Sequence, residues 1–260
     1  MGVFDGILIL SDLDGTLLKH GDLSDEHLLA VKYFTENGGL FCPATGRAET
    51  FIKENYPLLP LNSYCVVRNG TTIYDPKSDS LVWGKPLDPS VRQRVAEICR
   101  RYDTVIRVAY HFADEMLVIS REDVDFFERI LGEKRPIYKA VIHFEPNGAS
   151  RPAEDYKDHT DFQYVRSTHF LFEIISHGTG KGVCAGLIRD MVPKGTLIVG
   201  IGDYENDVSL LEASDLPVAV DGGWEPLKQY ARWVAPPIEE HPIAWLVKRL
   251  EQEISAGHKL

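Results

Sequence analysis

Short hydrophobic runs alternate with amphipathic stretches in the N-terminal part of the chain. Three runs have the length of buried strands and are bounded by turn residues: 6–11, 40–44 and 64–68. Ser24 precedes a stretch with hydrophobic residues on one face, which predicts a helix that begins there and stops at Asn37-Gly38. A second helix is expected from about Gly46 to Tyr56. Strands that alternate with helices predict a parallel sheet.

The pattern changes after Trp83 and changes back near Lys181. The intervening segment is predicted to form helices at 88–101 and 123–131 and strands at 104–110, 115–120, 137–144 and 169–176, with an exposed loop over 145–159. From Lys181 the alternation resumes, with helices at 181–191, 206–213 and 241–254 and strands at 197–201 and 217–220. The simplest prediction is one α/β domain, built from residues 1–83 and 177–260, with a smaller α+β domain inserted at 84–176.

Composition and charge limit the classes of protein to which the chain can belong. The chain of 260 residues is 44% hydrophobic and 26% charged, as in soluble globular proteins. Its 39 acidic and 28 basic side chains give a net charge of −11, which argues against binding to nucleic acid or to anionic membranes. No hydrophobic run near the start is long enough for a signal peptide or a membrane span, so we expect a cytoplasmic protein.

The cysteines predict neither a disulfide framework nor a zinc site. They lie far apart in the sequence without a C-x-x-C pair: Cys42, Cys65, Cys99 and Cys184. We expect them to be buried thiols in a reducing compartment.

Polar residues follow the predicted strands at the places where open parallel sheets bind ligands. After the first strand comes Asp12-Leu13-Asp14-Gly15-Thr16, after the second Thr45-Gly46-Arg47, and after the run that ends at Ile201 comes Gly202-Asp203-Tyr204-Glu205-Asn206-Asp207. Lys181 stands between two glycines where the inserted segment ends.

Four carboxylates are expected to converge at these strand ends with no arginine adjacent to them: Asp12, Asp14, Asp203 and Asp207. Such a group is unfavourable unless a cation or a proton is shared, and oxygen ligands with open positions suit Mg²⁺. Mg²⁺ and Lys181 would balance the charges of Asp12, Asp203 and Asp207, so that a phosphate could approach. Asp12 could then attack phosphorus, while Asp14 could protonate the leaving oxygen and later deprotonate water.

Simpler interpretations apply to parts of this pattern. An EF-hand that starts at Asp12 would need Gly and Glu where the chain has Leu17 and Leu23. A P-loop at Lys181 would need Ser or Thr where the chain has Gly182. Taken singly, Thr45-Gly46-Arg47 is typical of a helix start and Lys181 of a surface charge, whereas the two aspartate motifs together are far more specific.

In order and spacing, these four motifs resemble those of the haloacid dehalogenase (HAD) superfamily of phosphatases. The insertion between the second and third motifs, together with Asn69-Gly70, is similar to the Cof-like subgroup with a class IIB cap, which includes many sugar-phosphate phosphatases. One departure is Asp221-Gly222, where the subgroup often has Asn-Ala. The resemblance implies a Rossmann-like core and a cap that shields the reaction and selects the substrate.

The resemblance also implies roles for individual residues. Asp12 would be the nucleophile, and Asp14 the general acid and base whose backbone carbonyl touches Mg²⁺. Thr45 would bind the phosphate and Lys181 would neutralise it, while Asp203 would bind Mg²⁺ directly. Two further residues would complete or orient the metal shell, Asn206 and Asp207. Three would contact the substrate: Gly46, Arg47 and Asn69.

The leading hypothesis is a Mg²⁺-dependent phosphatase whose partner is a small phosphate ester, with sugar phosphates first. A phosphomutase that uses the same aspartyl-phosphate chemistry is the alternative, and a non-catalytic binding protein is a third possibility. The sequence is compatible with a monomer or a homodimer.

Overall fold

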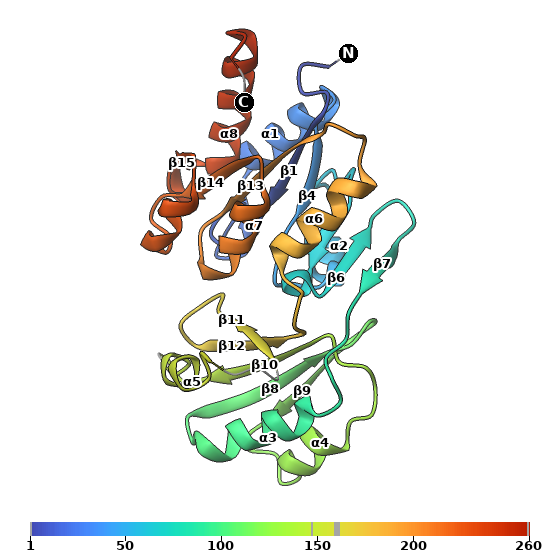
Figure 1. The fold of residues 1–260 in the computed structure, drawn as a ribbon, viewed down its shortest axis with the longest axis vertical. Helices are drawn as coiled ribbons and strands as arrows, with labels where there is room; N and C mark the ends of the chain where they lie inside the picture. The colour runs from blue at the N-terminus through green and yellow to red at the C-terminus, as the bar shows by residue number, and fades with distance from the viewer. Residues whose placement is uncertain (1, 147, 159–161, 259) are drawn as a thin grey trace. The chain divides into compact units, whose positions relative to one another are not determined.

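The structure is a computed structural model that describes residues 2–146, 148–158, 162–258 and 260 (Figure 1). The chain divides into two compact units, Met1–Trp83 with Gly180–Leu260, and Gly84–Thr179. Each unit has a hydrophobic core of its own. No helix in these described ranges is long and apolar enough to cross a membrane.

The first unit is built on a five-stranded parallel sheet in the order β15-β14-β13-β1-β4. Its strands are β1 (Ile7–Ser11), β4 (Leu40–Pro43), β13 (Leu197–Gly202), β14 (Leu216–Val220) and β15 (Trp233–Ala235). Every residue of β1 is buried, as the hydrophobic run predicts. Ser11 pairs with both Ile201 and Pro43, so the carboxyl ends of three strands meet at one edge. The predicted parallel sheet is confirmed except for the run 64–68. That run belongs to a separate small sheet and meets the parallel sheet only at the bridge between Ala44 and Val66.

Helices cover this sheet. They are α1 (Asp25–Glu36), α2 (Glu49–Asn55), α6 (Lys181–Met191), α7 (Val208–Ala213) and α8 (Pro242–Ser255). The side chain of Ser24 accepts a hydrogen bond from the backbone N–H of His27 at 3.2 Å, so the predicted N-cap of α1 is confirmed. Helix α1 packs against α8 and α6 against α7, and the second pair lies in front of the sheet in Figure 1.

Short elements complete the first unit. One hairpin is formed by β2 (Leu18–Lys19) and β3 (Asp22–Leu23), and a small sheet by β5 (Cys65–Val67), β6 (Thr72–Asp75) and β7 (Ser80–Gly84). A tight turn with positive φ angles spans Arg68–Gly70, and 3₁₀ segments occur at Glu205–Asp207, Glu225–Tyr230 and Ile238–Glu240. The 3₁₀ segments have no counterpart among the predicted elements, and α7 begins after the segment at Glu205–Asp207 rather than at Asn206.

The second unit is an antiparallel sheet with helices, in agreement with the predicted α+β class. Its strand order is β11-β12-β10-β8-β9. The strands are β8 (Val105–His111), β9 (Met116–Ser120), β10 (Lys139–Phe144), β11 (Gln163–Val165) and β12 (Leu171–Ile175), and the helices are α3 (Val91–Arg101), α4 (Phe126–Gly132) and α5 (Ser150–Asp155).

Helix α5 corrects the prediction of an exposed loop over 145–159, of which residues 147 and 159 lie outside the described part. Ala149 and Ala153 are buried in the core of the second unit, and Tyr164 donates a hydrogen bond to the carbonyl of Ala153 at 2.8 Å. Pro152 is in the first turn, where its missing N–H removes no helical bond. Tertiary packing thus outweighs the turn-forming composition.

All four cysteines are buried free thiols, as expected. The Cys65 thiol donates to the sulfur of Cys42 across 3.1 Å, so two residues distant in sequence are neighbours in the core.

Candidate active site

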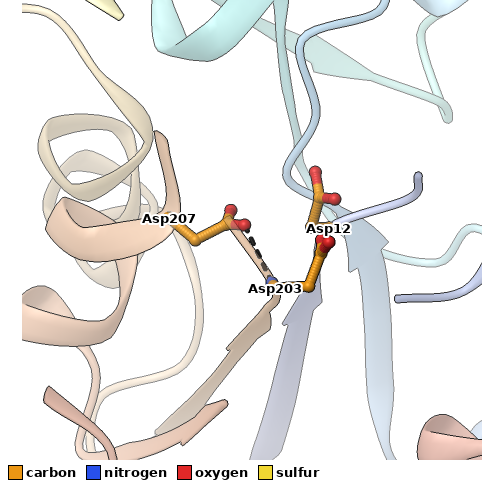
Figure 2. A group of neighbouring side chains, drawn as sticks. All are labelled: Asp12, Asp203 and Asp207. Atoms are coloured by element: carbon orange, nitrogen blue, oxygen red, sulfur yellow. Dashed lines mark hydrogen bonds between the residues drawn. The ribbon is translucent and has the colours of Figure 1, made fainter. Parts of the chain in front are cut away.

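Three carboxylates meet where β1 and β13 end. Asp12 follows β1 and Asp203 follows β13, and the parallel pairing of Ser11 with Ile201 places them side by side. Asp207 joins them from the 3₁₀ turn after β13. One carboxylate oxygen of each aspartate lies within 4.8 Å of the others, and Figure 2 shows Asp12 and Asp203 projecting from adjacent strand ends.

Lys181, the first residue of α6, is buried against two of these carboxylates. Its Nζ lies 2.6 Å from Oδ1 of Asp12 and 2.5 Å from Oδ1 of Asp207. Burial by itself lowers the pKa of the lysine, but the attraction of Asp12 and Asp207 outweighs it and holds the pKa above its ordinary value. Lys181 is therefore a fixed positive charge inside the site.

One ammonium group does not compensate for three carboxylates. Burial raises the pKa of Asp12 well above its usual range against the attraction of Lys181, and Asp207 and Asp203 raise it further. Burial and the charge of Asp207 likewise raise the pKa of Asp203 to about 7. A bound divalent cation would favour the ionised forms, and the carboxylate donors are those that Mg²⁺ prefers. The residues present therefore fit Mg²⁺.

Asp207 is oriented by hydrogen bonds to both of its oxygens. Oδ1 accepts from Lys181, and Oδ2 accepts from the backbone N–H groups of Asp203 and Tyr204, each at 3.1 Å. The dashed line in Figure 2 marks the bond to Asp203. These contacts suit a side chain that orients the site, and they leave Asp12 and Asp203 as the carboxylates with fewer fixed donors.

Two residues of the first motif support Asp203. Thr16 donates from Oγ1 to Oδ1 of Asp203 at 3.2 Å. Gly15 has φ +88, and a Cβ at this position would lie 2.3 Å from Oδ2 of Asp203. Both residues belong to the motif Asp-x-Asp-Gly-Thr, but the sequence alone assigns neither of them a role. Their signal is their place beside the aspartates, and the fold is needed to interpret it.

Asp14 does not join the three carboxylates through its side chain. It forms a two-pronged ion pair with Arg47, whose Nε and Nη2 lie 2.7 and 2.6 Å from its two oxygens. The guanidinium also stacks on Phe51, 3.8 Å from the ring centre. The expectation of four converging carboxylates without an adjacent arginine is therefore wrong. The cause is the pairing of β1 with β4, which places the segments after the two strands next to each other.

The remaining predicted site residues form a second group. Thr45 is buried and its Oγ1 accepts a hydrogen bond from the N–H of Arg47 at 3.1 Å. The N–H of Asn69 donates to the carbonyl of Thr45 at 2.9 Å, and Oδ1 of Asn69 accepts from Nδ2 of Asn206 at 3.1 Å. Gly46 lies against the Asn69 amide. The structure thus connects the second motif to the turn that carries Asp207.

Known proteins are similar to this chain over most of its length. A sequence model described as haloacid dehalogenase-like hydrolase matches residues 9–247. The 5-amino-6-(5-phospho-D-ribitylamino)uracil phosphatase YitU of Bacillus subtilis is 28% identical over 93% of this chain and 96% of its own. The glucosyl-3-phosphoglycerate/mannosyl-3-phosphoglycerate phosphatase of Persephonella marina is 20% identical over 82% and 84%. A solved HAD subclass IIB sugar phosphatase shares the fold, with a TM-score of 0.77 and 17% identity over 94% of this chain and 98% of that one.

Proposed function

The chain belongs to the haloacid dehalogenase-like hydrolase family, as a phosphatase of small phosphorylated metabolites, and we propose that it hydrolyses sugar phosphates with Mg²⁺ through a phospho-aspartate at Asp12. The observation that carries this proposal is the contact between Asp12 and Lys181 beside two further carboxylates. A buried ammonium group beside a carboxylate nucleophile neutralises both that nucleophile and the incoming phosphate.

The residues then have distinct tasks. Asp12 attacks phosphorus with the oxygen that Lys181 does not hold, and the ester oxygen leaves with the electrons of the broken P–O bond. Lys181 keeps its position because it is also bound to Asp207. Thr45 and the backbone amide of Gly46 hold the phosphoryl oxygens. Asp12 and Asp203 would hold Mg²⁺, with Asn206 and Asp207 orienting the site, and the Asp14 carbonyl would contribute as the family resemblance implies.

Mg²⁺, when bound, withdraws negative charge from the phosphoryl group and from the carboxylates that hold it. The chain's own residues supply the proton transfers. Asp14 donates a proton to the leaving oxygen and later takes one from the water that hydrolyses the phospho-aspartate. Arg47 holds the Asp14 carboxylate through two bonds, and contact of Arg47 with the anionic substrate would release this carboxylate toward the leaving oxygen.

The substrate class is proposed from the relatives. One relative removes phosphate from a ribityl chain, which is a sugar alcohol, and a structure with the same fold is a sugar phosphatase. Both leaving groups are alcohols flanked by further hydroxyls. We propose that residues 84–176, which fall within the second compact unit, act as the cap that selects such leaving groups.

The test is release of inorganic phosphate from an aryl phosphate and from a panel of sugar and sugar-alcohol phosphates. Activity should require Mg²⁺, stop with EDTA and disappear in Asp12→Asn, with Glu36→Gln on the exposed side of α1 as a variant that keeps activity. Full activity of folded Asp12→Asn would contradict the mechanism. Conversion of a hexose 1-phosphate into its isomer without free phosphate would instead favour the phosphomutase.

A further inference from the structure

Three consecutive residues after β5 adopt left-handed backbone conformations. The φ angles are +52 for Arg68, +58 for Asn69 and +80 for Gly70. Side chains with a Cβ rarely adopt this region, and successive residues in it are rarer still because each adds steric strain. Such a turn persists only where surrounding contacts hold it.

This left-handed turn contacts the segments that carry the other motifs. The N–H of Arg68 donates to the carbonyl of Arg47 at 2.9 Å, and the N–H of Asn69 donates to that of Thr45 at 2.9 Å. On its other side, the carbonyl of Gly70 accepts from the N–H of Gly180, the residue before Lys181, at 3.2 Å. A Cβ on Gly70 would lie 2.1 Å from the carbonyl carbon of Gly180, so the backbones touch.

The Asn69 side chain extends the same set of contacts to the fourth motif through its hydrogen bond to Asn206. One turn therefore contacts the phosphate-binding segment at Thr45, the start of α6 that carries Lys181, and the segment that carries Asp207. A displacement of the turn would move all three relative to Asp12.

The side chain of Arg68 anchors the turn through a buried ion pair. It is 1% exposed, and its Nη1 and Nη2 lie 2.6 and 3.2 Å from the two carboxylate oxygens of Glu49, at the start of α2. Nη1 also donates to Oγ1 of Thr72 at 3.3 Å. The carboxylate is itself buried, so the pair is shielded from water and its two parallel bonds fix both distance and orientation.

We propose that Arg68 and Glu49 form a positioning pair for the phosphatase site. The bonds between Arg68 and Glu49, and from Arg68 to Thr72, involve neither the proposed metal ligands nor the nucleophile. The pair acts by fixing the left-handed turn, and through the turn the relative positions of Thr45, Lys181 and Asn206. This inference rests on the proposed function, because it concerns the geometry of that site. A displacement of about 1 Å at a reacting centre can lower the rate by roughly 100-fold.

The experiment compares Arg68→Met, Arg68→Lys, Glu49→Gln and the double variant Arg68→Met/Glu49→Gln. At a temperature well below unfolding, Arg68→Met should lower kcat by about 10- to 100-fold, with a smaller change in KM. The double variant should lose no more than Arg68→Met alone, because the two residues act as one unit. Arg68→Lys keeps the charge and one contact, and its kcat should lie between those of the wild type and Arg68→Met.

Hydrogen exchange gives a readout that does not depend on activity. The amides of Arg68 and Asn69 should exchange at least about 10-fold faster in Arg68→Met, and at a rate between those of the wild type and Arg68→Met in Arg68→Lys. Two controls separate position from stability. Lys53 lies on α2, like Glu49, and Lys53→Met breaks its exposed ion pair with Asp79. Leu250→Ala removes a buried side chain of α8. Both should leave kcat and these two amides unchanged.

Unchanged kcat and unchanged exchange in folded Arg68→Met would overturn the proposal, as would equal losses in Leu250→Ala. If Arg68→Met does not fold, Arg68→Lys and Glu49→Gln carry the same test, and wild-type kinetics and exchange in both would overturn the proposal. A wild-type enzyme that releases no phosphate, with the exchange result intact, would count against the proposed function and not against the anchored turn.

Discussion

Replacement of Lys181 by methionine should destabilise the metal-free protein and make it more responsive to Mg²⁺. The ammonium group is fully buried and lies 2.6 and 2.5 Å from two carboxylates. Methionine fills a similar volume without the charge. The variant keeps Asp12, Asp203 and Asp207 in one buried group with no cation among them.

Removal of one partner from a buried ion pair costs about 3–5 kcal/mol. For a chain of roughly this size, each kcal/mol shifts the melting temperature by about 2–4 °C. Metal-free Lys181→Met should therefore melt about 6–20 °C below the wild type. Because Mg²⁺ relieves the repulsion among the remaining carboxylates, it should raise the melting temperature more in the variant than in the wild type, although the variant has no activity.

Calorimetric unfolding in EDTA and in MgCl₂ measures both effects. Lys139→Met is the matched control, since Lys139 lies 2.7 Å from Glu173 in a buried ion pair of the second unit. It should lose a similar amount of stability with no gain in the Mg²⁺ response. A Mg²⁺ shift in Lys181→Met no larger than in the wild type, or no loss of metal-free stability, would refute the assignment of Lys181 as the cation of a metal site.

Three further variants test other contacts. Gly15→Ala should raise the Mg²⁺ concentration for half-maximal activity by about 10- to 100-fold, because the new Cβ displaces Asp203; an unchanged value would show that this close contact has no effect on the metal. Arg47→Lys loses one of the two bonds to Asp14 and should lower kcat/KM by about 10-fold. The Mg²⁺ concentration for half-maximal activity should not change, and wild-type kinetics would contradict the proposed role of this pair. Burial lowers the pKa of His27 to about 4 from an ordinary value of 6.5. The folded protein therefore binds the proton less readily than the unfolded chain, and up to about 3 kcal/mol of stability should be lost as pH falls from 6.5 to 4. His27→Asn should lack this component in urea unfolding at several pH values, and an identical pH dependence in both proteins would contradict it.

The fold and the central carboxylates follow from local pattern combined with one general rule. The hydrophobic runs before Asp12 and before Asp203 are each of strand length, and parallel strands place their carboxyl ends at one edge. Lys181 could be added because it opens the helix where the inserted segment ends. Each of these inferences depends on residues close together in the sequence and on the regular geometry of a parallel sheet.

The side-chain pairings could not be derived in this way. Arg47 contacts Asp14, and Arg68 contacts Glu49, across loops that are far apart in the sequence. The relative positions of these loops depend on strand register and on the left-handed turn after β5. Neither pair has a sequence spacing that predicts contact. Helix α5 was missed for a related reason, because Ala153 in the helix and Ala149 before it gain stability only from the core that they help to form.

The most direct test of the mechanism is a search for phosphorylated Asp12. Wild type and Asp14→Asn are mixed with Mg²⁺ and an aryl phosphate, whose leaving group departs without a proton from Asp14, then quenched in acid within milliseconds and digested for mass spectrometry. The account predicts one added phosphoryl group on the peptide that contains Asp12, with more of it in Asp14→Asn because water is no longer deprotonated. Substrate turnover by the wild type with no phosphoryl group on Asp12 in either protein, or with the group on another residue, would contradict the account.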